Sequence, residues 1–469
     1  MARVVVVGGG VSGLAAALAV RAAAPPGTEV TVVEQSDRLG GKLRTGEVAG
    51  MAAEDGAETF LVRAPEVVDL AHAVGLDLVH PVTAAASLWV DGALRPLPAG
   101  TLLGIPTDPD AVEAAHVLPP EALDRLRAEP AGTAPILADG DIAVGALVRP
   151  RLGDAVVDRL VDPLLGGVYA GSADHLSLAV TVPALATAVR QHTSLVRAAQ
   201  AARAAAPAGS GPVFGSVPGG LSGLVGAVAA ASGAEFRFGL PVRELTPTPT
   251  GWRLVVGSAR DPELLEADAV VLAVPAGPAA RLLGGVDAAA AAEIGVLDYA
   301  SVGLVTLAIP RTELPGGALP AGSGLLVPAT EGLTVKAVTF LGQKWGTPAP
   351  DGLELVRASV GRYGEEAALQ RSDAELVEAV ARDLGQILGG TVRPVDARVT
   401  RWGGALPQYA PGHLDRIRRA RVALEPHGNL ALAGAAYDGV GIPACVRSGT
   451  AAGTRVGRAL QNRAESGDG

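Results

Sequence analysis

The feature that most constrains this chain is a glycine-rich turn near its N-terminus. Four valines at 4–7 predict a buried parallel strand, because β-branched apolar residues fill every position instead of alternating with polar ones. Gly8, Gly10 and Gly13 follow in the spacing of a dinucleotide-binding turn. In such a turn the first glycine allows the tight bend and the second lets the backbone approach a pyrophosphate. The third lets the next helix, here 14–24, pack on the strand.

An acidic residue follows the next predicted strand. That strand covers 29–33, and Glu34 comes 21 residues after Gly13, where a carboxylate can accept hydrogen bonds from the hydroxyls of a ribose. A glycine-rich turn alone is weak evidence in a chain with 62 glycines. The order strand, glycines, helix, strand and acid predicts a site for an adenine dinucleotide, and the alternative is a purely structural turn.

Composition narrows the class of protein. A length of 469 residues suits about three domains, or two domains with insertions. With 49% hydrophobic and 18% charged residues the chain is expected to be globular, and a net charge of −10 argues against a general nucleic-acid-binding protein. Cys445 is the only cysteine and the histidines show no zinc-binding spacing, so we expect neither an internal disulfide nor a metal site.

Residues 1–24 could also be taken for a signal peptide, since Arg3 precedes a largely apolar stretch. We reject that interpretation because the glycines fall where a strand–helix turn needs them. No other stretch has 18 uninterrupted apolar residues, so no membrane-spanning helix is expected, while peripheral membrane contact stays open. The simplest location is the cytoplasm.

Two further segments suit a flavin dinucleotide. A second glycine pair, Gly40 and Gly41, lies between Arg38 and Lys42, and it either adds backbone and charge near the phosphates or forms a solvated hairpin. Far away, an apolar strand over 430–433 leads through a loop into a helix predicted to end near residue 462. Free N–H groups at a helix N-terminus stabilise negative charge, such as that of a reduced flavin.

These segments resemble the flavoprotein amine oxidase and protoporphyrinogen oxidase superfamily. Residues 38–42 are similar to its RxGGR/K segment, and the loop over 435–446 is similar to its second FAD signature. The segments PLLGGVYAG at 163–171, PGGL at 218–221 and WGGALPQY at 402–409 resemble those of protoporphyrinogen and coproporphyrinogen oxidases in particular. The resemblance covers essentially the whole chain.

The resemblance implies an FAD-dependent oxidation of coproporphyrinogen III to coproporphyrin III in haem biosynthesis. Six electrons leave in three two-electron steps, with oxygen as acceptor and hydrogen peroxide as product. The flavin carries the chemistry, so no catalytic side chain is predicted. Protoporphyrinogen IX is the alternative substrate, and a non-catalytic flavin-fold binding protein, like the Rab escort group, is the alternative of another class. A haem-pathway partner such as a ferrochelatase is a further expectation.

The resemblance also implies which residues contact FAD. They are Gly8, Gly9, Gly10, Val11, Ser12, Gly13, Glu34, Gln35, Lys42, Gly56, Ala57, Glu58, Thr59, Val242, Trp402, Val440, Gly441 and Ile442. The segment 55–60 departs from the usual Gly-Pro of the family, which leaves its turn geometry open because alanine does not fix φ as proline does. Trp402 could instead be core packing, and Cys445 is either a buried spacer or a thiol of lowered pKa.

A substrate with four propionates needs local cations in a chain of net negative charge. The candidate cations are Arg44, Arg63, Arg95, Arg190, Arg197 and Lys336, each with a solvated surface cation as the alternative. Arg95 lies in a segment, 88–98, that resembles a family segment near the substrate. Tyr169 and Gly171 are candidates for the face of the tetrapyrrole ring, although Tyr169 could equally belong to the core.

The predicted fold class is α/β, with a discontinuous Rossmann-like FAD-binding domain, an α+β substrate domain and a helical lobe. The FAD-binding domain is assigned to 1–80, 212–276 and 397–469. The mainly helical lobe covers 81–211, with a helix over 184–206 and a linker over 207–212. An antiparallel sheet with a helix over 373–388 fills 277–396, and the tail after residue 462 is expected to be disordered. The active site is expected where sheet and lobe meet the flavin.

Overall fold

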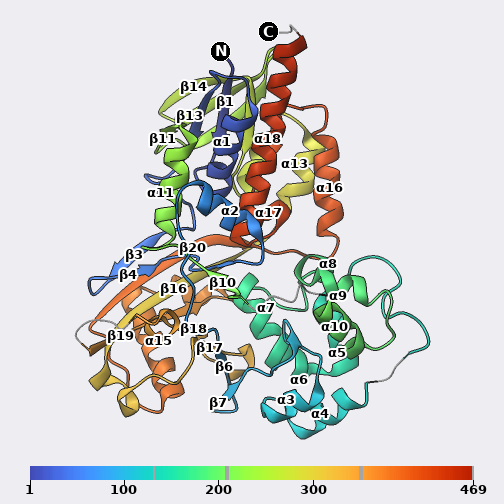
Figure 1. Ribbon diagram of the computed structural model, residues 1–469, viewed down its shortest axis with the longest axis vertical. Coiled ribbons are helices and arrows are strands. Elements are labelled where there is room, and N and C mark those ends of the chain that lie inside the picture. Colours follow the sequence, from blue (N-terminus) through green and yellow to red (C-terminus); the bar gives the residue numbers. More distant parts are fainter. Residues whose placement is uncertain (130–131, 206–210, 348–351, 467–469) are drawn as a thin grey trace.

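The computed structural model describes residues 1–129, 132–205, 211–347 and 352–466 (Figure 1). Its upper part is built on a parallel sheet with strand order β11-β2-β1-β15-β21. These strands are β1 (Arg3–Val7), β2 (Glu29–Val33), β11 (Glu235–Arg237), β15 (Ala269–Leu272) and β21 (Leu430–Leu432). They come from three distant stretches of the chain, as expected for a discontinuous nucleotide-binding domain.

Helices cover this sheet, and the two most distant ones pack against each other. The surrounding helices are α1 (Val11–Ala23), α2 (Pro65–Ala73), α11 (Leu221–Ser232), α12 (Ala276–Leu283), α13 (Ala288–Gly295), α16 (His413–Ala423), α17 (Ala435–Asp438) and α18 (Ile442–Ser466). A Cβ at Gly449 or Gly453 of α18 would lie 2.0 or 2.2 Å from a backbone oxygen of α1. Only glycine therefore lets α18 approach α1 this closely, and the two chain ends lie at the same end of the molecule (Figure 1).

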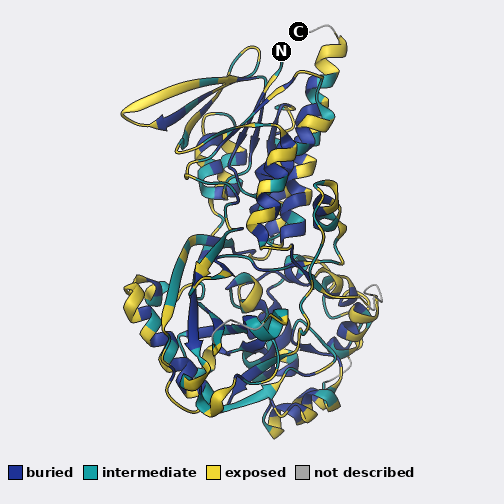
Figure 2. Cartoon of the chain, turned by 60° about the vertical axis from the view of Figure 1, so that its left-hand side comes forward, coloured by how far each residue is buried: buried dark blue, intermediate teal, exposed yellow. Residues whose placement is uncertain are grey.

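Short antiparallel elements extend the upper part. A three-stranded sheet consists of β12 (Val242–Pro247), β13 (Trp252–Ser258) and β14 (Asp261–Ala267), and small pairs join β3 (Thr45–Val48) to β4 (Met51–Glu54) and β5 (Phe60–Leu61) to β10 (Phe214–Gly215). Figure 2 shows buried residues in the interior of both parts of the molecule and exposed ones on outer helix faces and loops.

The lower part contains a seven-stranded sheet of order β20-β16-β19-β18-β17-β6-β7. Its strands are β6 (Ala86–Val90), β7 (Ala93–Pro96), β16 (Tyr299–Pro310), β17 (Gly324–Leu326), β18 (Val335–Phe340), β19 (Leu353–Val360) and β20 (Asp396–Pro407). Helix α15 (Asp373–Leu388) covers one face, and α14 (Leu341–Trp345) follows β18. The prediction of a purely antiparallel sheet within 277–396 was wrong, because β17 pairs in parallel with β6 and three strands come from outside that range.

The helical lobe packs around its own hydrophobic core. Its elements are α3 (Pro109–Ala114), α4 (Pro120–Arg127), α5 (Val144–Leu152), α6 (Asp154–Val156), a π-helical turn (Val157–Val161), α7 (Asp162–Tyr169), α8 (Leu178–Thr181), α9 (Pro183–Ala188) and α10 (Leu195–Ala204), with the small pair β8 (Thr101–Leu102) and β9 (Ile105–Pro106).

Three local predictions need correction or fall outside the description. The single helix predicted over 184–206 is two helices, because Ser194 caps α10 and the Glu129 carboxylate accepts from the N–H of Leu195 at 2.5 Å. The tail after Asn462 is not disordered from that point, since α18 continues to Ser466. Most of the predicted linker, 207–210, lies outside the described residues. Among the described helices none is both long and apolar enough to cross a membrane.

Candidate active site

Two glycine-rich loops lie side by side at the carboxyl end of the parallel sheet. Gly10 pairs with Gly40 as a parallel bridge, and the Gly40 N–H donates to the oxygen of Gly9 at 2.8 Å. Gly10 also begins α1 as its N-cap, without a side chain that accepts from the first N–H groups. These free donors and the positive end of the helix dipole suit a phosphate group.

Each glycine of the first loop has a distinct steric reason. Gly8 has φ +106°, which disfavours any side chain, and a Cβ at Gly13 would lie 1.9 Å from the Gly8 oxygen. A Cβ at Gly10 would meet nothing within 4 Å, so the backbone there faces open space. The loop therefore fits a dinucleotide whose pyrophosphate lies against Gly10.

The Glu34 carboxylate holds the glycine loop while facing the predicted ribose position. Its Oε2 accepts from the Gly9 N–H at 2.7 Å, and its Oε1 accepts from the N–H and Oγ of Ser36 at 2.9 and 2.8 Å. The N–H of Leu240 donates to the Glu34 oxygen at 3.1 Å, which brings the chain before Val242 beside Glu34, while Gln35 is exposed. Three predicted cofactor contacts thus come together from two distant segments.

A second cluster joins Lys42, Gly56 and Trp402. The Ala57 N–H donates to the Lys42 oxygen at 3.1 Å, and a Cβ at Gly56 would lie 2.0 Å from that oxygen. The Trp402 Nε1 donates to the Asp55 oxygen at 2.6 Å. The missing proline of the family's Gly-Pro is thus replaced by a turn that hydrogen bonds hold on two sides.

The Lys42 side chain is reached by solvent although protein atoms crowd around it. It is exposed to solvent, yet burial among protein atoms lowers the pKa of its amine. Both observations hold if solvent reaches the amine through a recess in the protein rather than at an outer surface. A cofactor bound there would exclude that solvent.

Glu58 is occupied by protein partners. Its buried carboxylate accepts from the Trp345 Nε1 at 2.7 Å, lies 3.0 Å from the Lys344 amine and pairs with Arg357. Burial opposes ionisation, but the two cations hold the pKa of Glu58 below its usual range. The Glu58 side chain thus ties the upper part to the seven-stranded sheet, which leaves the Glu58 backbone for FAD. Thr59 is half-buried.

Sequence reasoning missed the ion pairs around this turn. Buried Asp55 binds Arg398 through two hydrogen bonds of 2.6 and 2.8 Å and Arg44 at 2.9 Å. Arg398 follows Asp55 by 343 residues, so no local pattern could have paired them.

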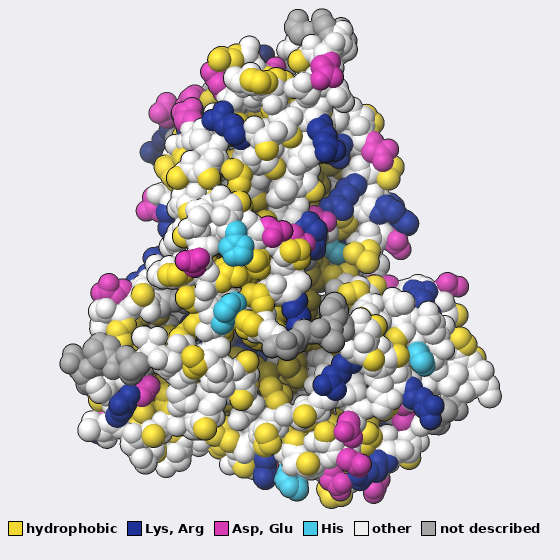
Figure 3. Space-filling model, viewed as in Figure 1, with side chains coloured by type: hydrophobic (Ala, Val, Ile, Leu, Met, Phe, Trp, Pro, Cys, Tyr) yellow, Lys and Arg dark blue, Asp and Glu magenta, His cyan; other side chains and the backbone are white. Residues whose placement is uncertain are grey.

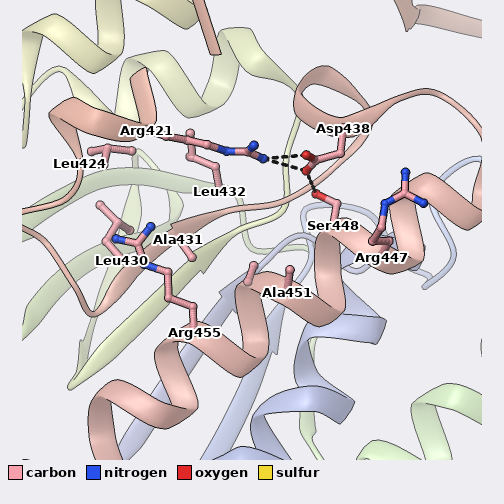
Figure 4. Close-up of a pocket in the computed structure, with 11 residues that line it drawn as sticks. Arg421, Leu424, Leu430, Ala431, Leu432, Asp438, Arg447, Ser448, Ala451 and Arg455 are labelled. Atoms are coloured by element: carbon pink, nitrogen blue, oxygen red, sulfur yellow. Dashed lines mark hydrogen bonds and ion pairs between the residues drawn. The ribbon is translucent and has the colours of Figure 1, made fainter. Parts of the chain in front are cut away.

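The C-terminal loop is anchored from behind. The Asp438 carboxylate accepts from Arg421 at 2.7 and 2.9 Å, and Ser448 donates to it while accepting from the Gly434 N–H at 2.9 Å. Figure 4 shows this network beside a cavity of about 320 Å³ between α16, β21 and α18. It fixes the start of α18, where Val440, Gly441 and Ile442 present their backbone.

Cys445 lies one turn into this helix. It is buried, and burial raises the pKa of its thiol. The structure thus favours a buried spacer over a reactive thiolate.

The comparisons with known proteins agree with this geometry. The family model for flavin containing amine oxidoreductase matches residues 11–457. The chain belongs to the flavin-containing amine oxidoreductase family. The predicted Rossmann-like α/β fold and the FAD cofactor are therefore confirmed.

Individual relatives match this chain almost end to end. Coproporphyrinogen III oxidase of Mycobacterium tuberculosis (strain ATCC 25618 / H37Rv) is 40% identical over 461 residues, which is 97% of each chain. Coproporphyrinogen III oxidase of Bacillus subtilis (strain 168) is 31% identical over 464 residues, 96% of each chain. A solved structure of a candidate protoporphyrinogen oxidase from Exiguobacterium sp. 255-15 has a TM-score of 0.85 and 33% identity, covering 97% of this chain and 98% of that one.

The predicted ring-facing residues of this chain lie next to the cluster around Trp402. Tyr169 ends α7, and its ring meets that of Tyr409 edge to face at 5.9 Å. A Cβ at Gly171 would lie 2.2 Å from the Gln408 Oε1. Ala170 packs in one hydrophobic cluster with Trp402, so the end of α7 lies against a residue predicted to contact FAD. Figure 3 shows a recess with hydrophobic side chains between the upper and lower parts.

The structure separates the candidate cations. Arg44 forms an ion pair with Asp55, and Arg190 donates to the backbone oxygens of Ala138 and Gly140 at 3.2 and 2.8 Å. Two others, Arg63 and Arg197, are exposed. Arg95 lies on edge strand β7, three strands from β18, and Lys336 is buried within β18. Of these cations, only Lys336 lies on a strand that α7 packs against.

Proposed function

We propose that this chain is an FAD-dependent coproporphyrinogen III oxidase that forms coproporphyrin III. The observation that carries the proposal is 40% identity over 97% of the chain to an enzyme of that name. It is supported by the hydrophobic cluster that Trp402 shares with Ala170 at the end of α7, which gives the macrocycle a place beside the flavin. Oxidation of a porphyrinogen in the haem pathway is the coarser statement that all the named relatives support.

The roles of the chain follow from the site. Bound FAD accepts two electrons at a time, so removal of six electrons takes three cycles with oxygen as acceptor and hydrogen peroxide as product. The glycine loops and Glu34 hold the dinucleotide, and the start of α18 offers N–H groups to the electron-rich ring. Tyr169, Gly171 and Trp402 orient the macrocycle and exclude water. No side chain is assigned as a base.

The test is direct. Purified protein is expected to be yellow, to release FAD on denaturation, and to convert chemically reduced coproporphyrinogen III to fluorescent coproporphyrin faster than autoxidation does. Three hydrogen peroxide molecules per porphyrin are expected. A yellow protein that does not accelerate the reaction contradicts the proposal.

Protoporphyrinogen IX remains the second candidate substrate, favoured by the Exiguobacterium neighbour at 33% identity. The ratio of kcat/KM for the two porphyrinogens decides between them. The non-catalytic alternative predicts a protein without FAD and is disfavoured by the open space at Gly10.

We keep as further proposals a cytoplasmic location, peripheral membrane contact, a ferrochelatase partner and the domain bounds given above.

A further inference from the structure

Lys336 is a buried cation without a partner among the described residues. Only 6% of its surface is exposed. Of the three lysines in the chain, Lys344 alone forms an ion pair in the described part. The Lys336 amine is nonetheless not one of the fully buried polar atoms that lack a hydrogen bond there, so its tip borders space that solvent can reach. The side chain has a buried stem and an accessible end.

A second cation lies beside it. Arg362 is half-buried, and its Nη2 donates to the Val327 oxygen at 3.1 Å, while the Val327 N–H donates to the Lys336 oxygen at 2.9 Å. Burial, and then the charge of Arg362, lower the pKa of Lys336. Burial lowers the pKa of Arg362, while the charges of Glu365 and then of Asp162 on α7 act in the opposite direction. The Asp162 Oδ1 accepts from the Ala173 N–H at 2.5 Å. Neither cation has a carboxylate within 4 Å in the described part of the chain.

The surroundings of Lys336 favour an amine on the side of the sheet that faces the helical lobe, away from α15. On the α15 side, Asp383 accepts from the N–H of Val335 at 3.0 Å, and the charge that shifts the pKa of Lys336 is that of Arg362. The register of β18 shifts between Val335 and Ala337, so the Lys336 side chain need not follow the alternation of strand side chains between the two faces of the sheet. Ala337 pairs with Leu326, which packs on the core of the lobe, so this side of the sheet faces α7.

Helix α7 faces that side with a small residue. A Cβ at Gly167 would lie 3.6 Å from Leu326, an ordinary contact, so α7 packs on β17 through glycine. The Tyr363 N–H, next to Arg362, donates to the Ala170 oxygen at 2.7 Å. Lys336 and Arg362 are thereby connected to Tyr169 and Gly171, the predicted ring-facing segment.

A buried lysine and a half-buried arginine without a paired carboxylate are costly to hold, because desolvation is not offset by an ion pair. A ligand carboxylate placed between them would remove that cost. We propose that Lys336 and Arg362 form a carboxylate subsite that binds a propionate of the tetrapyrrole and favours coproporphyrinogen over protoporphyrinogen. The inference rests on the proposed function. Coproporphyrinogen has propionates at two positions where protoporphyrinogen has vinyl groups, and a vinyl group cannot compensate a buried cation.

The test compares both substrates on Lys336→Leu, Lys336→Met and the control Arg382→Leu. Arg382 is an exposed cation on α15, on the opposite side of the sheet. For both Lys336 variants, kcat/KM for coproporphyrinogen is expected to fall about 10- to 100-fold, the loss of a charged hydrogen bond, with protoporphyrinogen unchanged or improved. The affinity for coproporphyrin III, followed by fluorescence quenching, is expected to fall in parallel. Lys336→Arg is expected to restore part of both, and the control to change neither.

The melting temperature and FAD content of the variants show whether Lys336 binds substrate or only supports the fold. Because the Lys336 charge is uncompensated in the free protein, both apolar variants are expected to keep wild-type FAD content and to melt at the wild-type temperature or above. An unchanged substrate ratio, or a lower melting temperature with loss of FAD in both variants, overturns the inference. If the wild-type protein oxidises neither porphyrinogen, the proposed function itself fails. If it oxidises coproporphyrinogen but the ratio of kcat/KM for the two substrates is the same in the Lys336 variants, only the inference about the subsite fails.

Discussion

Replacing Gly10 by alanine tests whether the open space beside this residue serves to bind FAD or is needed for the protein to fold. Gly10 has φ −71° and ψ 174°, which alanine adopts freely, and a Cβ would meet nothing within 4 Å. Alanine also restricts the unfolded chain, so we expect G10A apoprotein to gain about 0.4–1 kcal/mol of stability. The free protein should therefore melt at the wild-type temperature or slightly above.

The FAD-bound state should respond in the opposite way. The added methyl occupies the space in front of the first N–H groups of α1, where the pyrophosphate is expected. Losing one hydrogen bond to a charged group costs about 1.5–3 kcal/mol. At 1.4 kcal/mol for each tenfold change, the Kd for FAD should rise about 10- to 150-fold.

Differential scanning fluorimetry of apoprotein and titration with FAD measure both quantities. Gly226→Ala on α11 is the matched control, since a Cβ there also meets nothing within 4 Å. Gly13→Ala is the opposite case, because its Cβ would collide with the Gly8 oxygen at 1.9 Å, so this variant should lose the fold itself. FAD affinity of G10A within twofold of wild type would refute the reasoning, and so would a melting temperature as low as that of G13A.

Three further predictions use other parts of the molecule. Glu58→Gln leaves two cations facing a neutral group, so the free energy of unfolding in urea should fall by about 3 kcal/mol. The difference from wild type should shrink as the pH falls through the lowered pKa of Glu58. An unchanged urea midpoint at neutral pH would contradict this prediction. Burial lowers the pKa of Lys336 from 10.5 to about 7, so between these two pH values the unfolded chain binds more protons than the folded one. The free energy of unfolding should therefore rise with pH in this interval, and the Lys336→Leu variant should lose that rise. Equal slopes for the two proteins would contradict the prediction. Gly453→Ala places a Cβ 2.2 Å from the oxygen of Ala16 and should lower the melting temperature and FAD content together, unlike Gly428→Ala, where a Cβ meets nothing within 4 Å.

Local sequence predicted the cofactor half of the site well. The strand, glycines, helix and acid up to Glu34 follow largely from short-range geometry, since a Cβ at Gly13 would collide with the Gly8 oxygen and the Gly9 N–H donates to Glu34. Gly8 is the exception, because a Cβ there would also meet the distant Ala273. Helix α15 was also predictable, because Ser372 and Glu375 form a capping box at its start.

Contacts between distant segments were not predictable in the same way. Glu58 looks like a cofactor residue in its motif, but its carboxylate is taken by Arg357, 299 residues later. The helix predicted across residues 184–206 breaks because Glu129 supplies a cap from another segment. Lys336 was one cation among several candidates, and its burial beside Arg362 emerges only once β18 and α7 are placed together.

The close packing of α18 on α1 through Gly449 and Gly453, here called the glycine seam, has a consequence for synthesis of the protein. β21 is translated more than 400 residues after β1, and the helix that seals it emerges later still. At about 5–20 residues per second, the first strands wait roughly 20–85 s for their final neighbours. The coenzyme can thus be captured only after synthesis has passed the seam, and until then the early valine strands need shielding from aggregation.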